Sequence, residues 1–327
     1  MVEKKLGILI KRRRLAPKLS IFRIATTDGK QFPAYQAGKY IALRREDCLL
    51  TKKGTDPADR TSYVQARDEH GKLMRGPITH SYSISSAPFE TLQKGYLEFY
   101  ITLEVIGTLS GRLTESLFRM DPKKDNELTY VDRIVGNFTL EKRAAGYQNV
   151  LMVGTGTGLA PFASMIKQLD FEASQGETTS VRYTLLHANR TVNELAYHKQ
   201  LSDIESAARF DFVYVPSVSR PTHQDLTDPT IGKGRANNLL RFIFEMPLKE
   251  EENLRQVAVG KHTSAGHARV LSKTVRPSLP QHTTRKNLQD RLMPSRTVIL
   301  SCGNPHSMAD IQATGEAHSI HFEKEDW

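Results

Sequence analysis

The chain has 327 residues, which is long enough for two hydrophobic cores. Its 39% hydrophobic and 25% charged residues are ordinary for a globular protein and argue against disorder or a membrane class. The formal net charge of +10 favours acidic partners. No zinc-finger spacing, RNA-recognition signature or basic heptad region indicates nucleic-acid binding, so an acidic protein partner fits the charge better.

The N-terminus has too short an apolar stretch for a secretory signal, and no apolar run is long enough to span a bilayer. We therefore expect a cytoplasmic protein without membrane insertion, with a monomer favoured. Two cysteines, Cys48 and Cys302, are too few for an iron–sulfur cluster, which normally takes four thiolates. Any such cluster would have to lie on a partner, and we expect no bound metal.

Short extended segments bounded by turn residues dominate the first part of the chain. They are rich in β-branched, aromatic and aliphatic residues and cover residues 6–10, 19–24, 40–44, 81–85, 97–105 and 128–131. Several strands without long helices between them are typical of an antiparallel β-barrel. The one helix expected here covers residues 109–120, where Leu113, Leu117 and Met120 recur at helical spacing. The polar stretch 47–76 is expected to be an insertion in this barrel.

The pattern changes after residues 141–146. Residues 150–153 form a continuous apolar run, typical of a strand buried on both faces, and a glycine-rich turn then leads into a helix over 161–169. Similar strands are predicted at 181–187, 212–215 and 298–301, with a further helix over 194–208. Alternating strands and helices predict a Rossmann-like α/β domain with a parallel sheet. We place the boundary near Gly146, which gives domains 1–145 and 146–327.

One segment of the second domain, residues 250–296, fits the alternating pattern poorly. It holds nine Lys or Arg against four Asp or Glu, and its net charge of +5 is half of the excess of the whole chain. A basic insertion of this kind is either a docking surface for an acidic partner or a solvated surface excursion.

The glycine-rich turn comprises Gly154, Thr155, Gly156, Thr157 and Gly158, between a buried strand and a helix. Glycines at such a point let the backbone approach a pyrophosphate, whose charge is held by the amides of the helix N-terminus. A purely structural turn is the alternative. Pro161 is compatible with the first position of a helix and departs from the ordinary Rossmann fingerprint.

Two further motifs flank this turn in the sequence: Tyr82-Ser83-Ile84-Ser85 upstream and Cys302-Gly303-Asn304-Pro305 downstream. In this order the three motifs resemble the ferredoxin–NADP reductase family, particularly its bacterial branch. The likeness covers nearly the whole chain apart from the two insertions. It implies an FAD-binding antiparallel β-barrel, a Rossmann-like domain that binds NADP(H), and FAD and NADP(H) as cofactors.

The resemblance also implies the flavin contacts. Tyr82 would pack on the isoalloxazine and Ser83 would lie close to N5, where the hydride arrives, with Ile84 and Ser85 beside them. The arginine that usually contacts the flavin pyrophosphate is His80 in this chain. Because histidine lacks a bidentate fork and is mostly neutral at pH 7, either another cation substitutes or the flavin is held less tightly.

A second flavin-phosphate element is implied at Gly107, Thr108, Leu109 and Ser110, through the two hydroxyls and the amides that begin the next helix. A simple N-cap by Ser110 is the alternative, and the two are compatible. The C-terminal Trp327 is implied as a flavin contact, at the adenine or at the isoalloxazine, unless the tail frays. Glu325 is a candidate proton relay.

For the second cofactor, Arg190, Arg220 and Arg235 occur where bacterial relatives hold the adenosine 2′-phosphate, so NADPH is expected over NADH. A guanidinium suits a terminal phosphate because its planar donors pair with two oxygens. Cys302 ends an apolar strand, where a ligand crevice is expected. The resemblance places it against the nicotinamide as a positioning group, with Asn304 and Pro305 as further NADP contacts, and Gly303 would permit close approach. A small buried hydrophobe is the alternative for Cys302.

Taken together, these motifs predict an FAD-dependent, NADPH-linked reductase of ferredoxin or flavodoxin, with Ser83, Cys302 and Tyr82 as the catalytic residues. Hydride would pass from nicotinamide to flavin, and single electrons from flavin to the carrier. The reductase component of an oxygenase is an alternative in the same class. A flavin-binding fold without catalysis, serving as a binding module, is an alternative from another class, favoured by His80 and the basic insertion.

Overall fold

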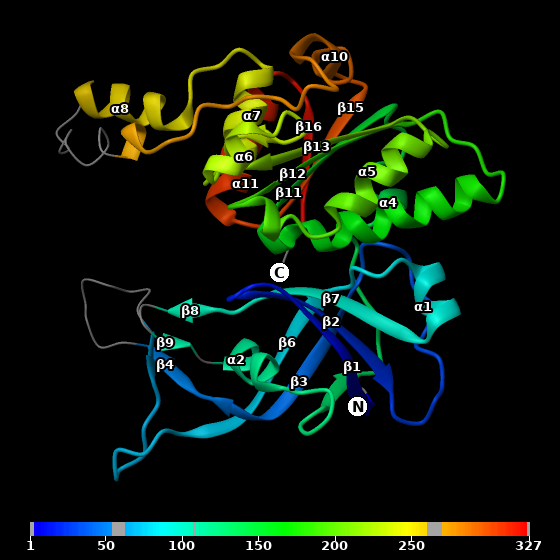
Figure 1. The fold of residues 1–327 in the computed structure, drawn as a ribbon, viewed down its shortest axis with the longest axis vertical. Coiled ribbons are helices and arrows are strands. Elements are labelled where there is room, and N and C mark those ends of the chain that lie inside the picture. The colour runs from blue at the N-terminus through cyan, green and yellow to red at the C-terminus, as the bar shows by residue number, and fades with distance from the viewer. Residues whose placement is uncertain (1–2, 54–62, 107–108, 111, 260–269, 326–327) are drawn as a thin grey trace. The chain divides into compact units, whose positions relative to one another are not determined.

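The computed structural model describes residues 3–53, 63–106, 109–110, 112–259 and 270–325. The chain forms two compact units, residues Met1–Asn137 and Phe138–Trp327 (Figure 1). The short helix α3 (Leu140–Arg143), which the sequence assigns to the first domain, belongs to the second unit.

A curled antiparallel sheet of six strands forms the first unit, in the order β6-β3-β10-β1-β2-β7. The strands are β1 (Lys4–Ala16), β2 (Leu19–Thr26), β3 (Tyr40–Leu49), β6 (Arg75–Ser83), β7 (Tyr96–Thr102) and β10 (Glu127–Val131). Beyond the end of β6, the amide of Ser85 donates to the carbonyl of Glu98 on β7 at 2.8 Å. This bond brings the two edge strands together, and the predicted barrel-type architecture is confirmed.

The core of this unit follows from the alternation of its strands. Apolar side chains that face inward, such as Phe22, Ile41 and Phe99, are at most 1% exposed. The helix α2 (Arg112–Arg119) adds Leu113 and Leu117 to the same cluster. Each buried side chain removes apolar surface from water, which is the main contribution to the stability of the unit.

Short elements connect these strands: β4 (Thr51–Lys53), β5 (Tyr63–Gln65), α1 (Pro88–Lys94), β8 (Val105–Ile106), β9 (Leu109–Ser110) and α2 (Arg112–Arg119). The helix predicted over 109–120 begins three residues later. Leu109 and Ser110 pair with β8 in a small hairpin instead, where the pairing satisfies backbone groups. The apolar residues at helical spacing begin only at Leu113, so the pattern gave no reason to start the helix at residue 109.

The second unit is built on a parallel sheet in the order β14-β13-β12-β11-β15-β16. Its strands are β11 (Asn149–Thr155), β12 (Arg182–Asn189), β13 (Phe212–Val218), β14 (Gly232–Lys233), β15 (Thr297–Cys302) and β16 (His321–Lys324). The predicted Rossmann-like domain is confirmed. Because the chain runs outward from β11 to β14 and then returns to β15 on the other side of β11, the strand order reverses between β11 and β15.

Helices cover both faces of this sheet (Figure 1). They are α4 (Leu159–Ser174), α5 (His198–Ala207), α6 (His223–Thr227), α7 (Ala236–Ile243), α8 (Lys249–Val259), α10 (Arg285–Gln289) and α11 (Pro305–Ala317), with single turns η1 (Gly156–Gly158) and η2 (Val192–Glu194). α4 and α5 lie together on one face, and α7 and α11 lie together on the other. Buried strands such as β11 are therefore apolar on both sides, as the sequence indicated.

The later part of the basic segment 250–296 belongs to the core of this unit and is not a surface excursion. Leu288 and Leu292 are at most 4% exposed and join the main apolar cluster. Arg291 is 6% exposed, and its guanidinium donates to the Thr184 hydroxyl at 2.9 Å and to Asp211 Oδ1 at 2.6 Å. A count of charges cannot distinguish such a buried, paired arginine from a solvated one.

Candidate functional site

The glycine-rich turn and the cysteine motif meet where the strand order reverses, at the carboxyl ends of β11 and β15. The two strands pair in parallel, with Gly154 opposite Cys302. The amide of Asn304 donates to Thr155 Oγ1 at 2.8 Å, which ties the two loops together. In open α/β sheets, ligands bind in the crevice outside the strand ends at such a reversal.

Glycine is required in both loops. A Cβ on Gly158 would lie 2.2 Å from the Cys302 carbonyl oxygen, and one on Gly303 would lie 2.2 Å from Thr155 Oγ1. Gly156 differs, because its φ is +59° and a Cβ there would meet no described atom within 4 Å. The turn therefore packs tightly against the cysteine loop and leaves the backbone at Gly156 open to a ligand, as a dinucleotide pyrophosphate requires.

The helix after this turn begins at Leu159, two residues before the predicted start. Pro161 is its third residue, and it is buried. A proline is tolerated there because the first amides of a helix have no partner within the helix. Gly156, Thr157 and Gly158 form the single turn η1 directly before this helix.

Cys302 is fully buried and does not stand alone. Its Sγ donates to Glu325 Oε2 at 2.8 Å, and the Glu325 amide donates to the Ser301 carbonyl at 3.1 Å. Burial, the charge of Glu325 and this hydrogen bond raise the pKa of the Cys302 thiol well above its usual range. The thiol is therefore protonated at neutral pH, which suits a positioning group and not a nucleophile.

Asn304 and Pro305 begin the next helix. Asn304 Oδ1 accepts hydrogen bonds from the amides of His306 at 3.0 Å and Ser307 at 3.1 Å, and Pro305 takes the first helical position. Both residues are exposed. Their assignment as NADP contacts stays a prediction.

The three arginines predicted for the 2′-phosphate follow the carboxyl ends of three neighbouring strands of the sheet. Arg190 and Arg220 follow β12 and β13, and the Arg220 amide donates to the Arg190 carbonyl at 2.8 Å. Arg235 follows β14, which pairs with β13. All three side chains are exposed.

Two of these arginines already have carboxylate partners. Arg190 Nε lies 3.2 Å from Glu194 Oε2, and Arg235 Nη1 lies 2.9 Å from Oε1 of the buried Glu250. A phosphate bound here would compete with both carboxylates. A cavity of about 450 Å³ is lined by residues 191–193, 222–225 and 228, which follow Arg190 and Arg220 in the chain.

The flavin motif lies at the end of β6. Tyr82 is half-buried against the core, and Ser83 is 5% exposed. Ile84 and Ser85 are fully buried, and the Ser85 amide makes the bond that joins the edge strands. The side chains of Ile84 and Ser85 thus serve the core of the unit, and their contact with a flavin stays a prediction.

Three residues of the predicted flavin site, Gly107, Thr108 and Trp327, lie outside the described residues. The backbones of Leu109 and Ser110 form β9. Arg112, which no motif singles out, lies beside His80, with its Nη2 3.2 Å from His80 Nε2. Nothing local in the sequence indicates this contact, because it joins β6 to the first residue of α2.

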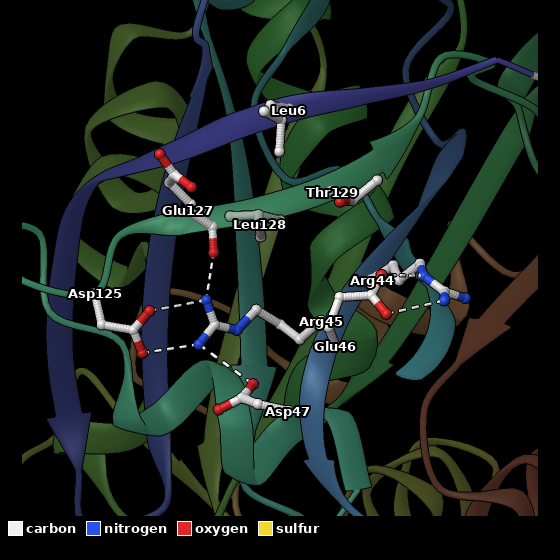
Figure 2. Close-up of a pocket in the computed structure, with 9 residues that line it drawn as sticks. All are labelled: Leu6, Arg44, Arg45, Glu46, Asp47, Asp125, Glu127, Leu128 and Thr129. Atoms are coloured by element: carbon white, nitrogen blue, oxygen red, sulfur yellow. Dashed lines mark hydrogen bonds and ion pairs between the residues drawn. The ribbon is translucent and has the colours of Figure 1, made fainter. Parts of the chain in front are cut away.

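A second cavity, of about 410 Å³, lies in the first unit (Figure 2). Charged residues line it, and they pair with one another. The Arg45 guanidinium contacts Asp125 Oδ1 at 3.0 Å and Oδ2 at 2.8 Å, and Asp47 Oδ1 at 3.3 Å, while Arg44 pairs with Glu46. No predicted cofactor residue lines this cavity. We therefore interpret its charged residues as a structural network that joins β3, β10 and α2.

Within the described ranges, no group of three or more His, Cys, Asp or Glu side chains is arranged to hold a metal ion. Over the same ranges, every helix is too short or too polar to cross a membrane.

Comparison with known proteins agrees with this geometry. Residues 152–240 match the model of the oxidoreductase NAD-binding domain. The chain is 28% identical over 173 residues to a ferredoxin–NADP reductase of Azotobacter vinelandii, covering 50% of this chain and 58% of the relative. It is 31% identical over 134 residues to a flavodoxin/ferredoxin–NADP reductase of Rhodobacter capsulatus, covering 41% of this chain and 42% of the relative. The matches thus span about half the length of these relatives.

The fold is similar over a longer stretch. A crystal structure of a ferredoxin NADP+ reductase from Neisseria gonorrhoeae, with bound FAD and NADP, superposes with a TM-score of 0.58 at 18% identity, covering 99% of each chain. Residues 152–240 thus match the oxidoreductase NAD-binding domain, and the resemblance of the chain to the ferredoxin–NADP reductase family is confirmed.

Proposed function

We propose that this oxidoreductase is an FAD-dependent, NADPH-linked reductase of an acidic electron carrier, a ferredoxin or a flavodoxin. The observation that carries the proposal is the meeting of the open turn at Gly156 with Cys302 at the reversal of the strand order. The similarity to reductases of ferredoxin and flavodoxin supports the same reaction class.

In the second unit, the residues present fit a nicotinamide dinucleotide. The open backbone at Gly156 and the first amides of α4 would hold the pyrophosphate. Arg220 is the exposed arginine of the three without a carboxylate partner among the described residues, and it would meet the 2′-phosphate first. Cys302, protonated and fixed by Glu325, would position the nicotinamide without reacting with it.

In the first unit, Tyr82 and Ser83 at the end of β6 fit a flavin ring. Burial raises the pKa of the Tyr82 hydroxyl, so the ring stays neutral and can flank an apolar ring system. A bound flavin would supply hydride acceptance from the nicotinamide and the release of single electrons. The chain supplies the binding and alignment of both cofactors.

The charge distribution supports an acidic partner, with exposed cations on β1 as well as in the basic segment. Arg276, Arg285 and Arg291 of the basic segment pair with carboxylates, whereas Lys273, Lys286 and Arg296 are exposed without a carboxylate partner among the described residues. On β1, Arg13 and Arg14 are exposed, and no carboxylate in the described part of the chain pairs with them. Unpaired cations on a strand attract an acidic carrier more strongly than neutralised ones, with rates that fall as salt rises.

Anaerobic titration with NADPH and with NADH, followed by the flavin spectrum, tests this function. We expect bleaching of the flavin with a preference for NADPH. Stopped-flow reduction of a panel of ferredoxins, flavodoxins and oxygenase components then separates the proposed carrier from the oxygenase alternative. A colourless protein that binds no added FAD and does not reduce ferricyanide with NADPH would leave only the non-catalytic binding module.

A further inference from the structure

His80 stands at the position where the family resemblance implies a phosphate-binding arginine, and a guanidinium reaches the same place from another element. Arg112 Nη2 donates to His80 Nε2 at 3.2 Å, and Arg112 Nη1 lies 3.1 Å from Glu104 Oε1. The Arg112 side chain is 29% exposed, so it is partly desolvated but still open to a ligand.

Most of the N–H donors of Arg112 have no partner among the described atoms. A guanidinium has five N–H donors, and the contacts with His80 and Glu104 occupy two of them among described atoms. Burial and the nearby charge of Arg112 lower the pKa of His80. A neutral His80 accepts the hydrogen bond at Nε2 and orients the guanidinium without repelling it.

The helix that carries Arg112 is held firmly against the sheet. Ser116 Oγ accepts from Arg45 Nε at 3.0 Å and donates to Asp47 Oδ1 at 2.6 Å. Arg119 pairs with Asp47 Oδ2 at 2.5 Å. Figure 2 shows Arg45 and Asp47 of this network on β3, which pairs directly with β6. Arg112 and His80 are therefore presented at a fixed distance by two connected elements.

We propose that Arg112 supplies the guanidinium that binds the flavin pyrophosphate, with His80 as its positioning residue. This inference rests on the proposed function, since it assigns a residue of the same flavin site. Planar paired donors match phosphate oxygens, which a single neutral imidazole cannot do. Of the two possibilities raised by the missing arginine, substitution by another cation is thus the one that the contacts support.

The test compares the affinity of the full chain, stripped of flavin, for FAD and for riboflavin, which has no phosphate. Quenching of flavin fluorescence measures both. Because a hydrogen bond to a charged group is worth at least about tenfold in affinity, Arg112→Gln should weaken FAD binding by about tenfold or more and leave riboflavin binding unchanged. Arg112→Lys keeps the charge but loses the paired donors of the guanidinium. Its affinity for FAD should lie between those of the wild type and Arg112→Gln.

Rescue gives the second measurement. His80→Arg in the Arg112→Gln background restores a guanidinium at the other end of the contact, and FAD affinity should recover. Arg44→Gln is the matched control, because Arg44 lies on the adjacent strand opposite Thr79 and pairs with Glu46. It removes the same charge and should leave FAD affinity unchanged.

Two results would overturn the inference while leaving the proposed function intact: wild-type affinity for FAD in Arg112→Gln, or an equal loss of FAD and riboflavin binding, which would show that Arg112 only supports the fold. Failure of the wild-type chain to bind FAD would overturn the proposed function together with the inference.

Discussion

His187 should make the second unit lose stability as the pH falls from neutrality. It lies in β12, is fully buried, and its Nδ1 is 3.0 Å from the Tyr214 hydroxyl. Within the described residues, its Nε2 has no hydrogen-bond partner. Burial, and secondarily the charge of His198, lower the pKa of His187 from 6.5 to about 3.

The sign follows from this direction. The folded state holds His187 neutral, whereas the unfolded chain takes up a proton as the pH falls through 6.5. His187 therefore contributes no destabilisation at a pH above its pKa in the unfolded chain. Stability is lost as the pH falls from that pKa towards the lower pKa of His187 in the folded state. Between pH of about 7.5 and about 5, the loss is about 2 kcal/mol, since each pH unit below the unfolded pKa costs ~1.4 kcal/mol.

Urea unfolding at the two pH values, followed by the fluorescence of the single Trp, measures this loss. The variant His187→Asn keeps an amide for the Tyr214 hydroxyl but cannot titrate, so its stability should change with pH by about 2 kcal/mol less than that of the wild type. His223→Asn, at an exposed position on α6, is the control and should retain the wild-type loss. An unchanged pH dependence in His187→Asn would refute the reasoning.

Three further predictions concern the cofactor site. Gly158→Ala places a Cβ against the Cys302 backbone, so binding of NADPH, measured by isothermal titration, should weaken by about tenfold or more, while wild-type affinity would contradict the need for close packing. Glu325→Gln removes the charge that helps to raise the pKa of the buried Cys302, so its thiolate, followed by ultraviolet absorbance against a Cys302→Ser control, should form at lower pH than in the wild type; an identical pH profile would count against the contact. Glu250→Gln removes the carboxylate paired with Arg235, so the ratio of kcat/KM for NADPH over NADH should rise severalfold, and an unchanged ratio would exclude Arg235 from the phosphate site.

Local patterns predicted much of the fold. Alternation of apolar residues marked the strands of the first unit, and continuous apolar runs marked those of the second. The turn at 154–158 was recognisable because glycines between a buried strand and a helix have few other uses. The boundaries were less accurate where no pattern existed, as at the start of α2, which lies at Arg112 and not at residue 109.

Contacts between distant segments decided the site. Glu325 reaches Cys302 only because β16 pairs with β15, and Arg112 reaches His80 only because α2 packs beside β3 and β6. The same holds for the pairing of Arg235 with Glu250, which changes the charge that a phosphate would meet. Neither the spacing of residues nor the composition of the sequence predicts any of these contacts.

By itself, then, the sequence determined the two domain types, the three motifs and the family that they resemble, because each depends on residues close together in the chain. Only the tertiary structure decided which charges are paired, which thiol is buried against a carboxylate, and which cation stands beside His80. Those properties depend on distances across the fold, which local sequence does not encode.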